Sequence, residues 1–559
     1  MTGPYDAKPW LARYGDVPGE VPPSVATALD LVHRAVRAAP EQRAITYFDG
    51  GLSYREVDDY SDAIAAYLAG RGFGRGDRLA LYLQNVPQFV LTLVAAWKLG
   101  GVVVPVNPMY RERELDLVLR DAGVSALVCS EAAWDTVAAA VAHAAGVRVV
   151  LTTCELDLQT RTDARVLGGI ERRRAAGVDD VVEVARSGAS APPPVELHSD
   201  DLALICYTSG TSGVPKGATT THANLATNAD VMIAWTGLAP GSAIFALAPL
   251  FHITGLAFEV VFALALAGPL VLCYRFDPAV ALDAFAEHRP AFTVGPATAY
   301  MALMASPDAT PEHFAGFRLL ISGGAPVPPA VVEQFGRRFG HYLHSGYGLT
   351  ETTAPCVLVP VGTPAPIDPQ SGTLSVGVPV PGAVLRILDE SGGEVAIGED
   401  GEIAVEGPMV VPGYWGQPAE TAASIPGGRL LTGDIGFMDA DGWFYVVDRK
   451  KDMINAAGFK VWPREVEDVL YTHPAIREAG VVGVPDAYRG ETVKAYVSLQ
   501  PGRTASEREL VDYCRGRMAA YKRPRQIEIL PELPKTISGK ILRRELRDAV
   551  AASSTAQPG

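Results

Sequence analysis

Short β-rich runs alternate with helical patterns in the first part of the chain. Between Arg78 and Ser130 the runs LALYL, VVVPV and ALVC are separated by VPQFVLTLVAAWKLG and RERELDLVLRDA, whose apolar positions recur with helical spacing. This alternation predicts crossover units and a mostly parallel sheet. The predicted fold class is therefore α/β. A chain of 559 residues is also long enough for several compact units.

Later segments predict further units. The stretch Val181–Asp201 is rich in Ala, Pro and Ser, which is typical of a linker between sub-blocks. Short strands with Gly and Asp turns predict a small β-rich subdomain over Gly382–Val446, and a separate α+β pattern follows from Pro463 to Met518. We expect a large multi-lobed N-terminal domain, made of two α/β sheets plus the β-rich subdomain, and a smaller C-terminal domain.

Composition narrows the possible functions. A formal net charge of -15 argues against nonspecific binding to nucleic acid, so small molecules are the expected partners. The six cysteines are scattered and form no C-x-x-C pair, which offers neither zinc spacing nor a disulfide framework. A reducing cytoplasm is the simplest interpretation.

Neither export nor integral membrane association is expected. The first residues carry no apolar segment behind basic residues, so they do not resemble a signal peptide. The longest apolar stretch, Leu256–Cys273, contains Glu259 and is split by Gly268 and Pro269. It predicts a buried helix followed by a strand.

The loop TSGTSGVPKG carries the first functional signal. It combines hydroxyl donors, glycine amides that can approach closely and one cation, all of which suit a polyphosphate. It is not the common P-loop, because Pro215 stands where a second glycine would be. We predict strand, glycine loop and helix in that order, with a solvated turn as the alternative. The candidate phosphate-binding residues are Thr208, Ser209, Gly210, Thr211, Ser212, Gly213 and Lys216.

Further motifs follow in a fixed order. After TSGTSGVPKG come PLFHITG, SGGAP, GYGLTET, TGDIG, DRKKDMI and PKTISGK. Together they resemble the acyl-CoA synthetases of the adenylate-forming superfamily, and the resemblance spans nearly the whole chain. It implies ATP-dependent conversion of a carboxylic acid to acyl-AMP, then thioester formation with coenzyme A and release of AMP and pyrophosphate.

The resemblance assigns nucleotide-binding roles to residues that would otherwise be interpreted as turn, core or solvated positions. Gly324, Ala325 and Pro326 match the adenine-lining turn, and Gly346, Tyr347 and Gly348 can place an aromatic ring against the base. Thr350 offers a hydroxyl to phosphate, and Glu351 matches the ligand of Mg2+. Asp434 and Arg449 match the ribose contacts.

Lys540 matches the superfamily's adenylation lysine, a compact cation able to bridge carboxylate and α-phosphate. Its delivery requires a mobile C-terminal domain, with Lys451 at the hinge position. The expected boundaries are therefore 1–448 for the N-terminal domain, 449–452 for the hinge, 453–550 for the C-terminal domain and 551–559 for a flexible tail.

Contacts to coenzyme A are less well specified. Gly458 matches the glycine that lets pantetheine pass, although it could equally be a turn glycine. Asn455 and Ala457 replace two lysines of the plant coumarate ligases, so those contacts are not carried over. The run from Arg543 to Arg547 is interpreted as a solvated helical face rather than a grip for the phosphates of coenzyme A.

The acid itself is only partly specified. His252 stands where amino-acid-activating relatives have an aspartate, which disfavours an α-amino acid, and it matches the acyl-pocket gate; a core histidine is the alternative. The segments Ile253–Phe258 and Val294–Tyr300 mix apolar and small side chains, which predicts a hydrophobic tube. A medium- or long-chain fatty acid is the first hypothesis, and an aryl or other bulky carboxylate the second.

Three further hypotheses stay open at this point. The acyl group could pass from acyl-AMP to a carrier protein or amine, or the chain could be a noncatalytic nucleotide-binding protein, although the intact set of charged candidates counts against that. The spacing around Lys540 also resembles the segment that protein acetyltransferases modify in bacterial acyl-CoA synthetases, which would remove the catalytic charge. The sequence does not decide between a monomer and a homodimer.

Overall fold

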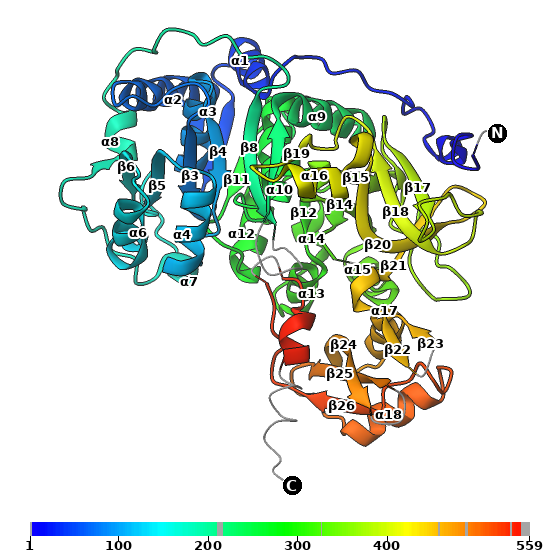
Figure 1. Cartoon of the computed structure of the whole chain (residues 1–559). Coiled ribbons are helices and arrows are strands. Elements are labelled where there is room, and N and C mark those ends of the chain that lie inside the picture. Colours follow the sequence, from blue (N-terminus) through cyan, green and yellow to red (C-terminus); the bar gives the residue numbers. More distant parts are fainter. Residues whose placement is uncertain are drawn as a thin grey trace.

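The strands of the protein lie in four sheets within the described residues. Two of these sheets are large and lie side by side, and the other two are smaller (Figure 1). The computed structural model describes the residues 3–208, 216–325, 327–456, 459–486, 490–536 and 539–548.

The first large sheet contains the segment of alternating runs. From edge to edge its strands are β19 (Gly413–Tyr414), β9 (Lys216–Thr221), β8 (Leu202–Thr208), β4 (Val102–Pro105), β3 (Arg78–Tyr82), β5 (Ala126–Ser130), β6 (Val149–Thr153) and β7 (Asp179–Asp180). The strands from β8 to β7 run parallel, and β4 is buried along its whole length, as expected when helices cover both faces of a parallel sheet. The predicted α/β class is confirmed.

The second large sheet is parallel in its centre and antiparallel at both edges. From edge to edge its strands are β16 (Val378–Pro379), β15 (Ala354–Leu358), β14 (Leu343–Leu349), β13 (Leu319–Ser322), β12 (Phe292–Gly295), β10 (Ile244–Phe245), β11 (Leu270–Leu272), β1 (Arg43–Tyr47) and β2 (Gly50–Ser53). The longer helices around the two sheets are α1 (Ala28–Ala38), α2 (Tyr54–Ala69), α3 (Pro87–Lys98), α4 (Glu112–Asp121), α9 (His222–Thr236), α12 (Pro278–His288), α13 (Ala297–Ala305) and α15 (Pro329–Phe339).

The β-rich subdomain forms where it was predicted, as an antiparallel sheet. Its strands are β17 (Val384–Leu388), β18 (Gly401–Glu406), β20 (Leu430–Met438) and β21 (Phe444–Arg449). The C-terminal sheet contains β23 (Phe459–Val461), β22 (Ile454–Ala456), β25 (Gly490–Leu499), β24 (Ile476–Asp486) and β26 (Gln526–Ile529), with α17 (Pro463–Tyr471) and α18 (Glu507–Arg515).

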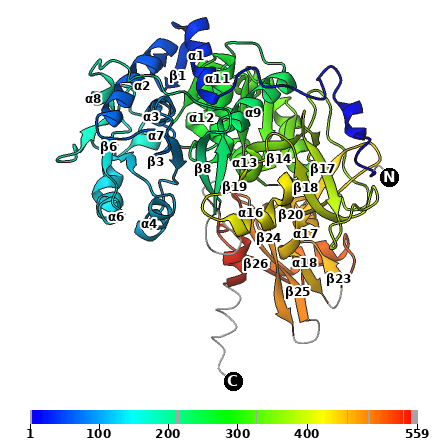
Figure 2. The ribbon, with the colours of Figure 1, turned by 45° about the horizontal axis from the view of Figure 1, so that its top comes forward.

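The C-terminal region has apolar cores of its own. The main core runs through both large sheets and reaches Val446, whereas a separate cluster extends from Ile454 to Ile527. Figures 1 and 2 both show the orange and red C-terminal elements projecting from one side of the larger body. The two parts meet at α13, where the hydroxyl of Thr298 donates a hydrogen bond to the carbonyl oxygen of Gly539 at 3.3 Å.

The predicted order of strand, glycine loop and helix is wrong. After the loop the chain forms β9, which pairs antiparallel with β8 so that Lys216 lies opposite Thr208. Helix α9 begins only at His222, after Thr221 has capped it with its side chain. The consecutive threonines of β9 favour a strand because β-branched residues pack well in a sheet, so the loop joins two strands of a hairpin.

Smaller differences between the prediction and the structure concern where individual elements begin and end. The expected linker contains a short helix, α8 (Val181–Ala185), which Asp180 caps. Helix α15 begins at Pro329, and Pro328 takes its N-cap position. The stretch Leu256–Cys273 forms buried helical segments and then β11, as predicted. Among the residues that the structure describes, none of the helices combines the length and the apolar character needed to span a bilayer.

Candidate active site

The two described ends of the phosphate loop come together at the end of the hairpin. Thr208 closes β8 and Lys216 opens β9 directly opposite it. The ammonium of Lys216 forms an ion pair with Glu420 in α16 (Pro418–Ser424) and lies 5.4 Å from the centre of the Tyr414 ring. The predicted residues Ser209, Gly210, Thr211, Ser212 and Gly213 lie outside the described residues.

Tyr414 links the loop to the predicted metal ligand. Its hydroxyl donates to Oε1 of Glu351 at 2.8 Å, while its ring faces Lys216. Thr350 and Glu351 lie in a short 3-10 turn, Thr350–Thr352, directly after β14. The sequence reasoning missed Tyr414, because the pairing of β19 with β9 that brings it here joins residues almost two hundred positions apart.

The predicted adenine turn and the glycine-flanked tyrosine lie at the same edge of the second sheet. Strands β13 and β14 are parallel neighbours; the adenine turn follows the carboxyl end of β13, and Gly346, Tyr347 and Gly348 form the last part of β14. Gly324 has φ +79°, a left-handed conformation that glycine adopts without strain, and Ala325 follows it. At Gly348 a Cβ atom would lie 1.8 Å from the carbonyl oxygen of Ala354, so only glycine fits. Pro326 lies outside the described residues.

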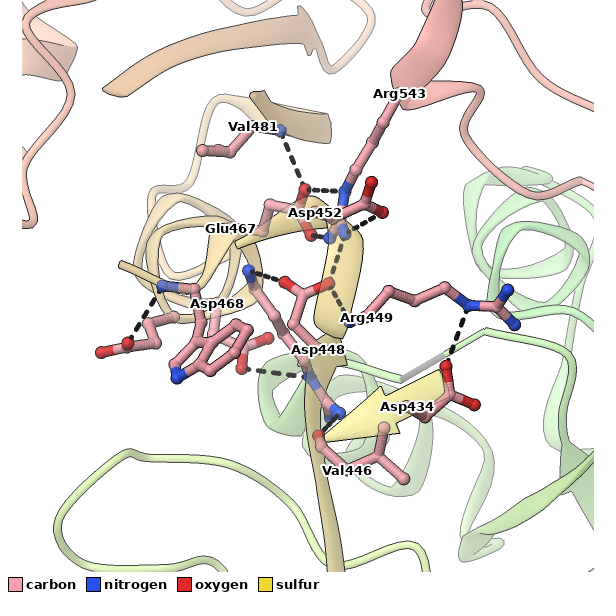
Figure 3. A network of polar contacts seen from close by, with 12 residues as sticks. Asp434, Val446, Asp448, Arg449, Asp452, Glu467, Asp468, Val481 and Arg543 are labelled. Carbon is pink, nitrogen blue, oxygen red and sulfur yellow. Dashed lines mark hydrogen bonds and ion pairs between the residues drawn. The ribbon is translucent and has the colours of Figure 1, made fainter. Parts of the chain in front are cut away.

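Tyr347, Asp434 and Arg449 form one polar group beside that edge. The Tyr347 hydroxyl donates to Oδ2 of Asp434 at 2.8 Å, and Nε of Arg449 lies 2.9 Å from Oδ1. The ion pair follows from the register of the β-rich sheet, which places Asp434 opposite Arg449 (Figure 3). Burial and the nearby Asp434 carboxylate raise the pKa of Tyr347 well above its usual range, so the hydroxyl stays protonated and keeps donating.

Lys540 is delivered to this group from the C-terminal region. The backbone amide of Lys540 donates to the Thr536 hydroxyl at 3.0 Å, and Gly539 rests against Thr298 of the larger body. Although its side chain keeps an exposed surface, the surrounding protein and the Arg449 guanidinium lower the pKa of Lys540 to about 8. The pKa of Lys540 also responds to Asp434, which opposes this decrease. Lys540 is therefore close enough to Asp434 and Arg449 for their charges to influence its pKa.

His252 lies within electrostatic reach of the same lysine. Burial, followed by the positive charge of Lys540, lowers the pKa of the imidazole to about 4, so His252 is neutral at neutral pH. Its Nδ1 accepts the backbone N–H of Thr254 at 3.2 Å and caps the short helix α10 (Ile253–Gly255). The following residues Leu256, Ala257 and Phe258 are buried.

A buried carboxyl group secures the segment that carries His252. Oε1 of Glu259 accepts the backbone N–H groups of Leu247 and Ala248 at 3.0 and 3.1 Å. Burial raises the pKa of Glu259 well above its usual range. The sequence pointed to Glu259 only as an interruption of an apolar stretch, and its role in holding the loop before His252 became visible in the structure.

The structure shows less about the predicted hinge residue and the predicted contact to coenzyme A than about the nucleotide-binding residues. Lys451 is exposed in a short 3-10 turn, Lys450–Asp452, which joins β21 to β22. Gly458 lies outside the described residues. The run from Arg543 to Arg547 is not a uniformly solvated face, because Arg543 and Arg547 pair with carboxylates of the chain and Leu546 is buried, whereas Arg544 and Glu545 are exposed.

Comparison with known proteins identifies the family. Residues 32–415 match the profile of the AMP-binding enzymes, and residues 465–540 match the AMP-binding enzyme C-terminal domain. The chain belongs to the AMP-binding enzyme family. Membership confirms the resemblance to the adenylate-forming acyl-CoA synthetases and the predicted class of enzyme, an AMP-forming acid–thiol ligase.

The relatives match the chain over nearly its whole length. A long-chain-fatty-acid–CoA ligase of Bacillus subtilis (strain 168) is 35% identical, covering 96% of this chain and 97% of its own. A feruloyl-CoA synthase of an Amycolatopsis species is 36% identical, covering 92% and 97%. The crystal structure of the anthranilate CoA ligase AuaEII with anthranoyl-AMP is 26% identical, with a TM-score of 0.86 and coverage of 97% and 99%.

Proposed function

We propose that this ligase activates a medium- or long-chain fatty acid with ATP and transfers the acyl group to coenzyme A. The observation that carries the proposal is the contact of Gly539 with Thr298, which brings the neighbouring Lys540 to the larger body. There Lys540 lies within electrostatic reach of His252 at the predicted acyl gate and of Asp434 and Arg449 at the predicted ribose site. An ammonium group between these two places is suited to bridge a carboxylate and an α-phosphate.

The remaining residues fit the positioning of ATP. The hairpin loop from Thr208 to Lys216 offers donors for phosphate, and Thr350 adds a hydroxyl on the facing turn. Tyr347 lies at the edge that would receive adenine, and Asp434 with Arg449 would hold the ribose. Adenylation needs in-line attack of the carboxylate, so such positioning is most of the catalytic task.

Glu351 fits a magnesium ion in this arrangement. The structure contains no group of three or more His, Cys, Asp or Glu suited to a metal among its described residues, so a metal here would rely on phosphate oxygens. Mg2+ is commonly held by one or two carboxylates together with substrate phosphates, and Glu351 accepts the hydroxyl of Tyr414, whose ring lies beside Lys216 of the phosphate loop. The bound ion would neutralise charge on the departing pyrophosphate.

The comparisons favour a fatty acid and support an aryl acid as the second candidate. A relative named long-chain-fatty-acid–CoA ligase matches nearly the full length, and the buried Leu256, Ala257 and Phe258 would provide apolar walls for an acyl chain. The feruloyl-CoA synthase is equally similar, however, and the anthranilate CoA ligase shares the fold. Each added methylene in an apolar tube changes discrimination by only about 1 to 3 kcal/mol, so chain length needs measurement.

The decisive assay is carboxylate-dependent exchange between ATP and pyrophosphate over a panel of fatty and aryl acids. We expect exchange with acids of intermediate or long chain, and the corresponding thioester once coenzyme A is added. Exchange without thioester would favour transfer to a carrier protein or amine. The absence of exchange with every acid would exclude the proposed activity.

The second half-reaction requires the C-terminal region to rotate about residues 449–452. The separate apolar clusters on the two sides of this segment support the proposed division into the domains 1–448 and 453–550. The proposed tail, 551–559, lies outside the described residues. Rotation would withdraw Lys540 and leave room for pantetheine near Gly458. Burial of all six cysteines as free thiols suits the proposed cytoplasmic location.

Acetylation of Lys540 is a proposed form of regulation. The exposed surface of the Lys540 side chain would give a lysine acetyltransferase access, and acetylation would remove the charge that adenylation requires. Stoichiometrically acetylated enzyme should lose acyl-AMP formation but keep conversion of supplied acyl-adenylate. Full adenylation by such a sample would exclude this regulation. Whether the protein is a monomer or a homodimer can be decided separately by sedimentation equilibrium.

A further inference from the structure

Arg543 lies three positions after Lys540 and is enclosed by carboxylates. Its side chain is only 19% exposed. One terminal nitrogen lies 2.6 Å from Asp448 and 3.4 Å from Asp452, while the other two nitrogens donate to both oxygens of Glu467 at 2.7 and 3.1 Å (Figure 3). An arginine with so many charge-assisted contacts has a defined orientation.

Two of these carboxylates lie on opposite sides of the proposed hinge, and Asp452 lies within it. Asp448 precedes residues 449–452 and belongs to β21 of the larger body, whereas Glu467 follows them in α17. Arg543 also follows the hinge, so it would move together with Glu467. Rotation about the hinge must therefore break the contact between Arg543 and Asp448, while the contact with Glu467 can persist.

Other groups of the C-terminal region reinforce the contact at Asp448. The backbone N–H of Arg464 donates to the second oxygen of Asp448 at 2.9 Å, and the Arg464 guanidinium donates to the carbonyl oxygen of Val446 at 2.5 Å. Asp448 is only 6% exposed. Since a desolvated carboxylate is stable only when it is paired, the chain has a strong preference for the orientation in which these contacts form.

The contact also restricts where Lys540 can lie. Three residues of extended chain span at most about 10 Å, so fixing Arg543 confines the backbone of Lys540 to a small region. In this orientation Gly539 lies against Thr298, and Lys540 is held near Asp434 and Arg449.

Building on the proposed role of Lys540, we propose that Arg543 is a positioning residue for the first half-reaction. Its pair with Asp448 holds the C-terminal region in the orientation that presents Lys540, and this pair is released when the region rotates for thioester formation. Arg543 acts through Lys540 and through the hinge, without contacting substrate.

The test compares Arg543→Gln with Arg544→Gln. Arg544 is a matched control, because it is the neighbouring arginine and its side chain is 73% exposed. Among the described residues it forms one ion pair, with the exposed Asp548, which is long at 3.8 Å. Single-turnover measurements would follow acyl-AMP formation, and separately the conversion of supplied acyl-adenylate and coenzyme A to thioester. We expect Arg543→Gln to slow acyl-AMP formation about tenfold, which corresponds to a modest shift between two orientations, without slowing thioester formation. Arg544→Gln should change neither.

A second variant keeps the pair between Arg543 and Glu467. Asp448→Asn removes the charge only on the other side of the hinge, so it should produce the same separation of the two half-reactions. Because the turn with Lys450 and Lys451 is exposed, both Arg543→Gln and Asp448→Asn should also be cut there by trypsin several-fold faster than the parent enzyme or Arg544→Gln, at temperatures below their thermal transitions.

Three results would overturn the proposal: equal loss of both half-reactions, an equal effect of Arg544→Gln, or unchanged cleavage at the hinge in both variants. The proteolysis also separates this inference from the proposed function. If the parent enzyme forms no acyl-AMP with any acid, the proposed function is wrong, and the cleavage rates still decide whether the contact between Arg543 and Asp448 restrains the hinge.

Discussion

Gly539→Ala tests whether the contact between the two parts of the chain matters for adenylation. Gly539 lies directly before Lys540, and its φ is +80°. A Cβ atom at this position would lie 2.2 Å from Oγ1 of Thr298 and 3.1 Å from Pro296. The substitution therefore adds both backbone strain and a clash at the surface where Lys540 is presented.

The two effects can be separated with a control glycine in the same region. Gly502 has φ +73°, and nothing lies within 4 Å of its added Cβ atom. Gly539→Ala and Gly502→Ala should therefore share the same strain of about 1–2 kcal/mol for a left-handed alanine. Only Gly539→Ala must also move its segment by roughly 1 Å to restore an ordinary contact with Thr298, and a misplacement of that size can slow a reaction about 100-fold.

The assay is single-turnover formation of acyl-AMP, with thioester formation from supplied acyl-adenylate measured in parallel. We expect Gly539→Ala to lose about 100-fold in the first step and to keep the second, because the clash exists only while Gly539 faces Thr298. Adding Thr298→Ala should recover about tenfold, since Pro296 remains close. Equal losses in both steps, or the same loss in Gly502→Ala, would refute the reasoning.

Three further predictions concern the charges of the site. Lys540→Ala should lower acyl-AMP formation about 100- to 1,000-fold and leave conversion of supplied acyl-adenylate within about twofold, and comparable loss in both steps would contradict the assigned role. Because the Lys540 pKa is lowered to about 8, its charged form is lost as the pH rises through 8, and kcat/KM for acyl-AMP formation should fall with a midpoint near 8. An unchanged rate up to pH 9.5 would argue against the Lys540 ammonium as the catalytic cation. Glu351→Gln should raise the Mg2+ concentration for half-maximal exchange about tenfold, whereas Tyr414→Phe, which keeps the carboxylate, should raise it less. Identical Mg2+ dependence in Glu351→Gln and the parent would exclude Glu351 as a ligand.

Local sequence patterns determined the fold class and several elements of this protein. Period-two and helical spacing depend on neighbouring residues, so the runs LALYL, VVVPV and ALVC correctly predicted β3, β4 and β5, and the segments between them predicted α3 and α4. The ordered motifs likewise predicted the family and enzyme class. The same local reasoning failed at Lys216–Thr221, where an expected loop and helix start formed a strand, because pairing with β8 outweighed the local signal.

Only the tertiary structure decided how distant residues meet. Tyr414 reaches Glu351 across 63 positions, and Arg543 reaches Asp448 across 95, through strand pairing and domain contact that no local pattern encodes. The sequence therefore predicted a solvated face where the structure buries Arg543 among carboxylates. A charged residue looks the same in a sequence whether it faces water or a partner, and its environment is set by the free energy of packing the whole chain.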